Sequence, residues 1–479
     1  IILYIIITGI GVLNHEAYED EAQSWLIARD LSFSGIISQM KYEGHSFLWY
    51  FLIAPFAKLG MPMQVQSFIS WFFCIASVIL ILKKAPFNKL IKLIFIFSSG
   101  LLYFYSIIAR PYCMIPLFLI LIAIIYPSRD KHPYKYAILL SLLANTHLIM
   151  LPTVFILALM FWGKKILNKS KEENRKDIYL SLIILIIGVG IYISIAIAAI
   201  FNCKIVEAQN NYKLINNFSD VIYMLKSTSL RFINFLYGMN PPHYILGAVI
   251  ISLILCVIAW IFDVEQGTIF FIQLICNIIL HSFSWFLLMS RVCVIFYSLL
   301  FWLWNSSYKK DKTKSSILVS IASCILVIVS IFSTFTLLYK DVNDNFSTGK
   351  EVANYIDKNL QPGTKIFCLD SELQQSIIGY LKKDKYHFYM LKTNKEVTFT
   401  TWDDDWLNYD TNEEKIEKLN GLLKEQDKVY VLISGYVQHI DLLNKFDYDV
   451  LIDTSGKIID SMYVRNEIYK LVEIKREEV

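Results

Sequence analysis

Charged side chains are scarce in this chain of 479 residues: Asp, Glu, Lys and Arg make up 18%, whereas 56% of the residues are hydrophobic. The mean hydropathy is +0.48. A soluble domain of this length would carry more charge and fewer long apolar runs. The net charge of +4 is also small, so no basic field indicates a nucleic acid partner. The composition therefore predicts a membrane protein without a nucleic acid ligand.

The eight cysteines show no C-x-x-C pair and no Cys/His spacing that is typical of a zinc site. Six of them fall within apolar runs, where a thiol behaves as a small hydrophobic side chain. Cys203 and Cys368 lie in more polar stretches. Either all eight cysteines are free thiols, or these two form a disulfide. We expect no disulfide.

Apolar runs recur along the first 339 residues. They predict about eleven spans, at residues 1–13, 64–82, 91–108, 112–126, 136–146, 148–163, 178–201, 243–262, 268–289, 292–306 and 317–339. The fourth, fifth and sixth runs are short and are expected to be tilted or broken helices. The first residue is Ile rather than Met, so the first run is either the end of a longer helix or a signal-like segment. We favour the helix.

Basic residues gather in the loops after the second, fourth, sixth and tenth spans: Lys83, Lys84 and Lys89; Arg129, Lys131 and Lys135; Lys164, Lys165, Lys169, Lys171, Arg175 and Lys176; Lys309, Lys310, Lys312 and Lys314. If the chain alternates across the bilayer, these loops share one side, which the positive-inside rule makes cytoplasmic. Residues 14–63, residues 202–242 and everything after about 340 are then extracytoplasmic. The loops therefore predict a multi-pass protein of the plasma membrane.

The segment after residue 340 is rich in Asp, Lys, Asn and Glu and contains no further span. Its patterns predict strands at residues 365–370, 387–391, 429–434 and 449–453, and helices at residues 348–360, 371–382 and 412–425. We therefore expect a transmembrane domain at residues 1–339 and a small α/β domain at 340–479. Asp403, Asp404 and Asp405 stand between Trp402 and Trp406, and we interpret them as a polar loop, with carbohydrate binding as a minor alternative.

The first external segment, residues 14–63, is too long and too apolar for a plain connection between two spans. Trp25, Leu26 and Ala28 begin an apolar stripe along one helix, and residues 46–59 provide a second. Frequent Trp and Tyr are typical of segments that lie in the membrane interface. The segment therefore predicts two helices lying flat on the outer surface.

Four carboxylates, Glu16, Glu19, Asp20 and Glu21, stand where the first of these helices begins. Because like charges repel, the group needs a cation, a metal or a catalytic function. A structural interpretation is equally open: Asp20 followed by Gln23 fits a capping box, and acidic residues suit a helix N-terminus.

Several of these motifs resemble the first external loop of bacterial GT-C-fold glycosyltransferases, which include relatives of the protein O-mannosyltransferases and of the aminoarabinose transferases that modify lipid A. The motifs are Asp20-Glu21-Ala22-Gln23, residues 25–30, Tyr42-Glu43-Gly44-His45 and Leu48-Trp49-Tyr50. The resemblance continues at Ala109-Arg110-Pro111-Tyr112, recurs at residues 142–147, and is weaker at Arg291. Ser46 stands where many relatives have Pro, so the subfamily and its sugar stay open.

The resemblance implies a mainly α fold: a polytopic helical bundle with interfacial helices in the first external loop, followed by an extracytoplasmic domain. It also implies an inverting transfer of a sugar to an extracytoplasmic glycan, lipid or protein. Because nucleotide sugars are confined to the cytoplasm, the donor would be a polyprenyl-phosphate sugar in the membrane. Asp20 would take the proton from the acceptor hydroxyl, and Glu21 would orient the acceptor or Asp20 itself.

Cationic groups would stabilise the departing phosphate. Arg110 and Arg291, at outer ends of spans, are the first candidates because a planar guanidinium matches phosphate oxygens. The further candidates are Arg29, His45, His147 and Tyr112. Four of these residues could instead have a purely structural role. The two arginines could extend to lipid headgroups, His147 could cap a helix, and His45 could pack beneath the second flat helix.

Three further readings stay open. The first is a divalent metal, which Glu19, Asp20 and Glu21 could hold with His15 or His45. The resemblance favours no metal, and we expect no cofactor.

The second is a transporter or flippase of lipid-linked sugars, which would show polar mid-membrane helices and related halves. The spans hold few charged residues and show no clear repeat. The third is a non-catalytic scaffold, in which Asp20 would be dispensable.

Overall fold

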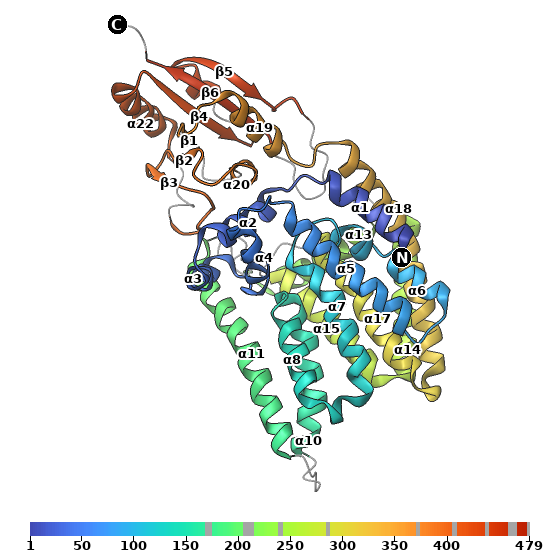
Figure 1. Cartoon of the computed structure of the whole chain (residues 1–479). Coiled ribbons are helices and arrows are strands. Elements are labelled where there is room, and N and C mark those ends of the chain that lie inside the picture. The colour runs from blue at the N-terminus through green and yellow to red at the C-terminus, as the bar shows by residue number, and fades with distance from the viewer. Residues whose placement is uncertain are drawn as a thin grey trace.

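The computed structural model describes residues 1–167, 175–204, 215–237, 243–283, 288–369, 374–404, 410–435, 440–457 and 467–476. A helical bundle occupies the chain as far as residue 343, and a sheet with short helices follows it. Figure 1 shows this C-terminal part, in orange and red, on one end of the bundle, with α2, α3 and α4 between the two.

Seven helices among the described residues are long and apolar enough to cross a membrane. They contain α5 (Val65–Lys84), α7 (Met114–Ile125), α9 (Leu151–Ala158), α11 (Arg175–Asn202), α14 (His243–Phe262), α15 (Val264–Phe283) and α18 (Thr313–Asn343). Short 3-10 or π segments extend three of them, to Pro111–Lys131, Leu148–Leu167 and Lys310–Asn343, and α10 (Lys164–Leu167) ends the second. Each coincides with an expected span, and the mainly α, multi-pass fold is confirmed.

The helices at the other four expected spans are shorter than these seven. Three are α1 (Ile2–Asn14), α8 (Pro133–Ala144) and α17 (Val294–Ser307), which follows the short α16 (Met289–Val292). The fourth divides into α6 (Lys89–Ile96) and a π-helical turn at Gly100–Phe104, where the Tyr297 ring packs against Gly100 with no room for a Cβ. All of α17 from Val294 to Ser306 is buried. Its apolar sequence therefore reflects contact with other helices rather than with lipid.

The basic loops meet at the end of the bundle away from the C-terminal part, where α10 lies in Figure 1. Glu265 is 3.6 Å from Arg129 and 3.4 Å from Lys309, and Lys165 is 2.7 Å from Asp130. The acidic loop between α14 and α15 thus supplies a partner to basic residues from two other loops. Ion pairing explains why carboxylates occur at this otherwise basic end.

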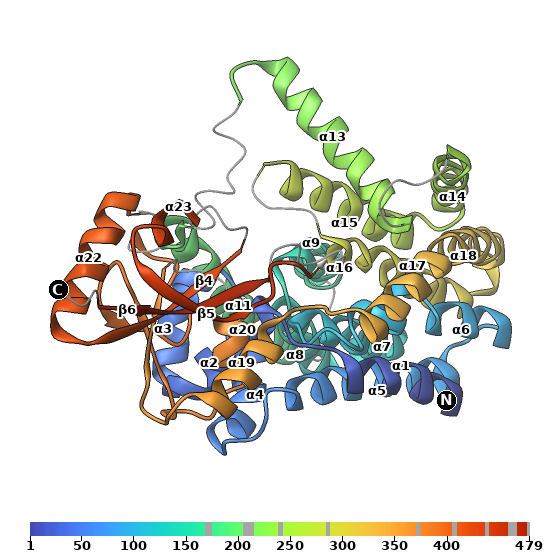
Figure 2. The ribbon, with the colours of Figure 1, turned by 90° about the horizontal axis from the view of Figure 1, so that it is seen from above.

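The second external segment contains a helix that the sequence did not predict, α13 (Phe218–Tyr237). It carries Asp220, Lys226 and Arg231, so its hydropathy is too low for a span. Figure 2 shows α13 on the side of the molecule away from α2 and α4, while the sheet lies over α11 and α20.

The first external segment forms three helices rather than two: α2 (Glu19–Asp30), α3 (Phe33–Glu43) and α4 (Leu48–Lys58). The Ser32 side chain caps α3 by accepting a hydrogen bond from the Gly35 N–H. Gly44 ends α3 with φ +67°, a left-handed conformation that glycine adopts without strain. The chain reverses direction at this turn, so that α4 packs against α2 and His45 follows directly after the turn.

The described residues after 343 form a six-stranded sheet of order β3-β2-β1-β4-β6-β5. Its strands are β1 (Lys365–Cys368), β2 (His387–Met390), β3 (Lys395–Glu396), β4 (Lys428–Ser434), β5 (Asp447–Asp453) and β6 (Tyr469–Lys475). The helices here are α19 (Gly349–Asn359), α20 (Gln375–Ile378), α22 (Asn412–Glu425) and α23 (Ile440–Leu443). All four expected strands are present, and so are helices near residues 348–360 and 412–425. Residues 371–373 of the helix expected at 371–382 lie outside the described residues, and in the rest of that range the helix α20 covers Gln375–Ile378.

β1 runs parallel to β2 and β4, whereas β6 is antiparallel to β4 and β5. The C-terminal part also packs onto the first external segment, because Leu26 of α2 belongs to the same apolar cluster as Val352 and Ile377. None of the eight cysteines forms a disulfide, as expected.

Candidate functional site

Asp20, at the start of α2, forms an ion pair with Arg110 at the surface. Asp20 lies in the first turn of α2, and 42% of its side chain is exposed. Its Oδ2 is 3.2 Å from Nη1 of Arg110 and accepts a hydrogen bond of 3.1 Å from the Tyr18 hydroxyl. Arg110 also donates to the backbone oxygen of Asp20, at 3.0 Å. Asp20 is therefore oriented and still accessible to a ligand.

A line of contacts leads from Arg110 to four other candidate residues. Nη2 of Arg110 is 3.3 Å from Nε2 of His45, whose ring lies 5.6 Å from that of His147. The Tyr112 hydroxyl is 3.3 Å from Nε2 of His147 and accepts a 3.1 Å hydrogen bond from Nε of Arg291. The structure thus brings six of the eight candidate residues together, from four separate segments of the chain.

The charge of this cluster favours an anion. Burial lowers the pKa of His45 to about 3, and the charges of Arg110 and Arg291 act in the same direction. His45 is therefore neutral at physiological pH, and the two guanidinium groups supply the positive charge. Asp20 contributes one negative charge, which leaves an excess positive charge that suits a phosphate group.

Glu21 belongs to a different environment, because its side chain is fully buried. Its Oε2 lies 2.8 Å from Nε2 of His15 and accepts from the Tyr18 N–H at 3.2 Å, while Oε1 accepts from the Ala109 N–H at 2.5 Å. Nδ1 of His15 is 2.9 Å from Asp341. Burial lowers the pKa of His15, but the carboxylates of Asp341 and Glu21 outweigh it and hold the pKa well above its usual value. Glu21 therefore ties α2 to neighbouring segments behind the cluster.

The expected capping box of Asp20 and Gln23 is wrong. The N-cap residue of α2 is Tyr18, and Glu21 provides the side chain that accepts from its backbone N–H. Gln23 instead donates to Glu43 at 2.9 Å and to the backbone oxygen of Thr400 at 2.7 Å. The helix α2 therefore begins at Glu19, two residues before the start that an Asp20 N-cap would give.

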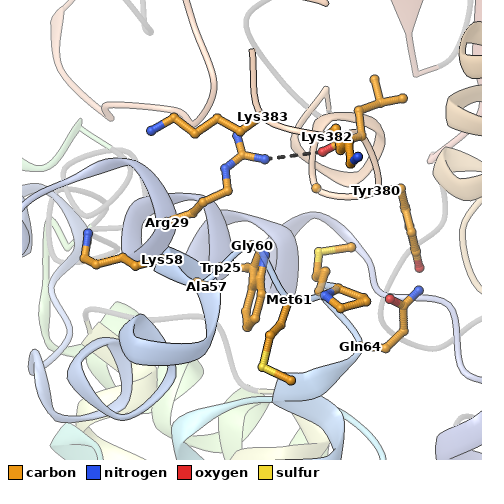
Figure 3. Close-up of a pocket in the computed structure, with 14 residues that line it drawn as sticks. Trp25, Arg29, Ala57, Lys58, Gly60, Met61, Gln64, Tyr380, Lys382 and Lys383 are labelled. Atoms are coloured by element: carbon orange, nitrogen blue, oxygen red, sulfur yellow. Dashed lines mark hydrogen bonds between the residues drawn. The ribbon is translucent and has the colours of Figure 1, made fainter. Parts of the chain in front are cut away.

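Arg29 does not join the cluster. It lies nine residues after Asp20, and at 100° per residue an α-helix turns it to roughly the opposite face. There Nε and Nη2 of Arg29 donate to Asp30 at 2.8 and 3.0 Å, and Nη1 donates to the Leu381 oxygen at 3.5 Å. Figure 3 shows Arg29 in a pocket beside Lys58 and Lys383.

Glu43 is a carboxylate of the site that the sequence did not single out. Its Oε1 accepts hydrogen bonds from Gln23 and Gln39 at 2.9 and 3.3 Å, and its Oε2 accepts from Tyr50 at 3.5 Å. Burial raises the pKa of Glu43 to about 7, and the nearby charge of Asp20 adds to the effect, while the hydrogen bonds oppose it. A signal was present in the sequence: a glutamate directly before a helix-ending glycine opposes the helix dipole.

Three of the alternative metal ligands have other partners. His15 and Glu21 bind each other, and Asp20 pairs with Arg110. Across the described ranges, no group of three His, Cys, Asp or Glu side chains is arranged to hold a metal ion.

Trp402 of the acidic loop is buried and packs with Ala199 and Cys203 at the end of α11. Asp404 forms a 3.0 Å ion pair with Lys204. Trp402 therefore connects α11 to the C-terminal part, which does not favour stacking on a sugar. Asp405 and Trp406 lie outside the described residues.

Comparison with known proteins gives a result at the level of fold. No model of a protein family matches the sequence, and no curated protein matches it. Solved structures do match its fold. Two of them are crystal structures of ArnT from Cupriavidus metallidurans, one in the apo state and one bound to undecaprenyl phosphate. The TM-scores are 0.57 and 0.52 at 10% identity, over 98% of this chain and 97% of each ArnT chain.

This likeness covers the helical bundle and the C-terminal part together. The chain therefore has the GT-C fold, as its motifs implied. The protein that shares it in the two structures is ArnT, an aminoarabinose transferase. At 10% identity the likeness concerns the fold alone.

Proposed function

We propose that this chain is a membrane glycosyltransferase that moves a sugar from a polyprenyl-phosphate donor to an acceptor hydroxyl. The observation that carries the proposal is the exposed Asp20 carboxylate, 3.2 Å from Arg110 and next to a cluster with excess positive charge. The GT-C fold supports it, and so does the ArnT structure with bound undecaprenyl phosphate, a lipid of the required chemical class.

In the proposed reaction, Arg110 and Arg291 bind the donor phosphate, and Tyr112 orients Arg291 through its hydroxyl. The acceptor oxygen attacks the anomeric carbon from the opposite face, so the configuration inverts. Asp20 takes the acceptor proton as the new C–O bond forms. The bond between the anomeric carbon and the phosphate oxygen breaks, and its electron pair stays with the polyprenyl phosphate.

Glu43 and His45 support this step. Glu43, whose pKa is raised in part by the charge of Asp20, holds the acceptor or receives its proton in turn. The neutral His45 imidazole contacts Arg110 on one side and the His147 ring on the other. Glu21 has a positioning role, because its contacts with His15 and Ala109 set the start of α2 and hence the place of Asp20.

We also propose an orientation. The basic loops face the cytoplasm, and the opposite end, with residues 14–63 and the C-terminal domain at 340–479, faces outward from the plasma membrane. The transmembrane domain at residues 1–339 holds the lipid donor. The acceptor is an extracytoplasmic glycan, lipid or protein.

The test replaces Asp20 by Asn in the full chain and follows transfer from a polyprenyl-phosphate sugar in membranes. We expect a loss of about 10²–10⁴-fold in rate, with unchanged binding of polyprenyl phosphate. Glu413→Gln is the matched control, because Glu413 is an exposed first-turn carboxylate of α22. Retained transfer in the Asp20→Asn variant would overturn the mechanism, because another group would then take the acceptor proton. No transfer by the wild type would favour a scaffold or a transporter.

A further inference from the structure

A cavity lies on the opposite side of α2 from Asp20. It has a volume of about 590 Å³ and is enclosed by α2, the turn between α4 and α5, and residues 379–383 of the C-terminal part. Trp25 and Tyr380 are among its apolar walls (Figure 3). The proposed transfer reaction uses none of these residues.

The cavity is strongly basic. Of the residues that line it, four are cationic and none is acidic: Arg29, Lys58, Lys382 and Lys383. The neighbouring Asp30 is the partner of Arg29 and lies 3.5 Å from Lys383, so one negative charge faces four positive ones. Burial and the charge of Lys383 lower the pKa of Lys58, which indicates that these cations repel each other. An anion between them would relieve this repulsion.

The position of the cavity indicates where such an anion comes from. Its residues 60–64 lead directly into α5, the first long span, which begins at Val65. Leu59 at its rim is 80% exposed, and Phe68 and Phe72 are exposed along the outer side of α5. Large apolar side chains in this arrangement suit acyl chains, and cations above them suit a headgroup phosphate.

We propose that this cavity binds the phosphate headgroup of an anionic membrane glycerophospholipid, whose acyl chains lie along α5. The lipid joins two parts of the molecule, because Arg29 and Lys58 belong to the first external segment and Lys382 and Lys383 to the C-terminal part. Apart from the lipid, the contacts here include the hydrogen bond from Arg29 to the Leu381 oxygen and the close packing of Gly379 on Met63. A bound headgroup therefore stabilises the attachment of the C-terminal part.

The experiment uses the full chain in nanodiscs of phosphatidylcholine, with or without phosphatidylglycerol. The test variant is Lys58→Gln combined with Lys383→Gln, and the control is Lys358→Gln combined with Lys424→Gln. The control removes the same charge from exposed helix positions outside the cavity. Retained lipid is counted by native mass spectrometry, and the unfolding temperature is followed by tryptophan fluorescence.

We expect phosphatidylglycerol to raise the unfolding temperature of the wild type and of the control. For the test variant, the rise in unfolding temperature should be much smaller. Retention of phosphatidylglycerol by the test variant should fall on the order of thirtyfold, because each lysine near an anionic lipid contributes a factor of about five. In pure phosphatidylcholine both variants should show a cooperative unfolding transition, which verifies that both are folded.

Two results would overturn the proposal. One is equal retention of phosphatidylglycerol by the test variant and the control. The other is full stabilisation of the phosphatidylcholine sample by soluble glycerol phosphate or inorganic phosphate, which would identify a free anion as the ligand. Neither outcome bears on Asp20, so the proposed transfer reaction is tested separately.

Discussion

Glu467 offers the sharpest test of how the C-terminal part is joined to α2. Its side chain is fully buried, and its Oε1 accepts a hydrogen bond from the backbone N–H of Glu19. Its Oε2 has no hydrogen-bond partner among the described residues. Burial raises the pKa of Glu467 to about 8, although hydrogen bonds from Ser347, Glu19 and Ser376 oppose the shift. In the folded protein the carboxyl group is therefore mostly protonated at pH 7, whereas in the unfolded chain it is ionised.

The sign of the effect on stability follows from this difference. A group whose pKa is raised by folding gives its full contribution below its ordinary pKa, near 4.5, and loses it as the pH rises through about 8. At ~1.4 kcal/mol per pKa unit, the interval from 4.5 to about 8 corresponds to ~5 kcal/mol. Glutamine is neutral at every pH, so Glu467→Gln should remove this dependence.

The assay compares unfolding midpoints of the wild type, Glu467→Gln and the control Glu413→Gln in one detergent at pH 5, 6, 7, 8 and 9. The wild type and the variants share all other titrating groups, so the effects of these groups cancel when unfolding midpoints are subtracted at each pH. We expect the midpoint of Glu467→Gln relative to that of the wild type to rise steadily between pH 5 and pH 8, while the control stays parallel to the wild type. A constant difference between Glu467→Gln and the wild type across this range would refute the reasoning.

Three further predictions concern the cluster and its support. Because burial raises the pKa of Glu43 to about 7, Glu43→Gln should flatten the dependence of the transfer rate on pH around neutrality; an unchanged inflection would exclude a role for this group. Asp341→Asn removes one partner of the buried His15 and should destabilise the protein by ~3–5 kcal/mol in a denaturation assay, whereas an unchanged midpoint would contradict the network. Arg110→Lys keeps the charge but loses the planar fork, so it should weaken binding of polyprenyl phosphate about tenfold, measured by titration; equal affinity would place the phosphate elsewhere.

Much of the architecture was predictable because it depends on local sequence. The length and hydropathy of runs such as 178–201 and 317–339 are sufficient to identify α11 and α18, since crossing a bilayer requires a minimum apolar length. Strands such as β1 and β4 are short and rich in β-branched or aromatic residues between charged neighbours, so they were also predicted.

Other elements could not be predicted, because they depend on partners that are distant in sequence. The buried helix α17 has the composition of a span but is surrounded by protein. β6 was missed because Lys470, Glu473 and Lys475 give it the appearance of a surface segment. In the structure it lies between β4 and β5, and Leu471 and Val472 are buried in the sheet.

The adjacent carboxylates Asp20 and Glu21 show most clearly where prediction from sequence ends. The sequence alone determined that acidic residues stand at the start of an interfacial helix in a membrane protein, and its motifs indicated the fold. It could not determine the surroundings of each side chain, because neighbouring residues on a helix point about 100° apart and either direction was open. Only the tertiary structure decided, by placing Ala109, 88 residues away, and the His15–Asp341 pair around Glu21, and by leaving Asp20 exposed beside Arg110.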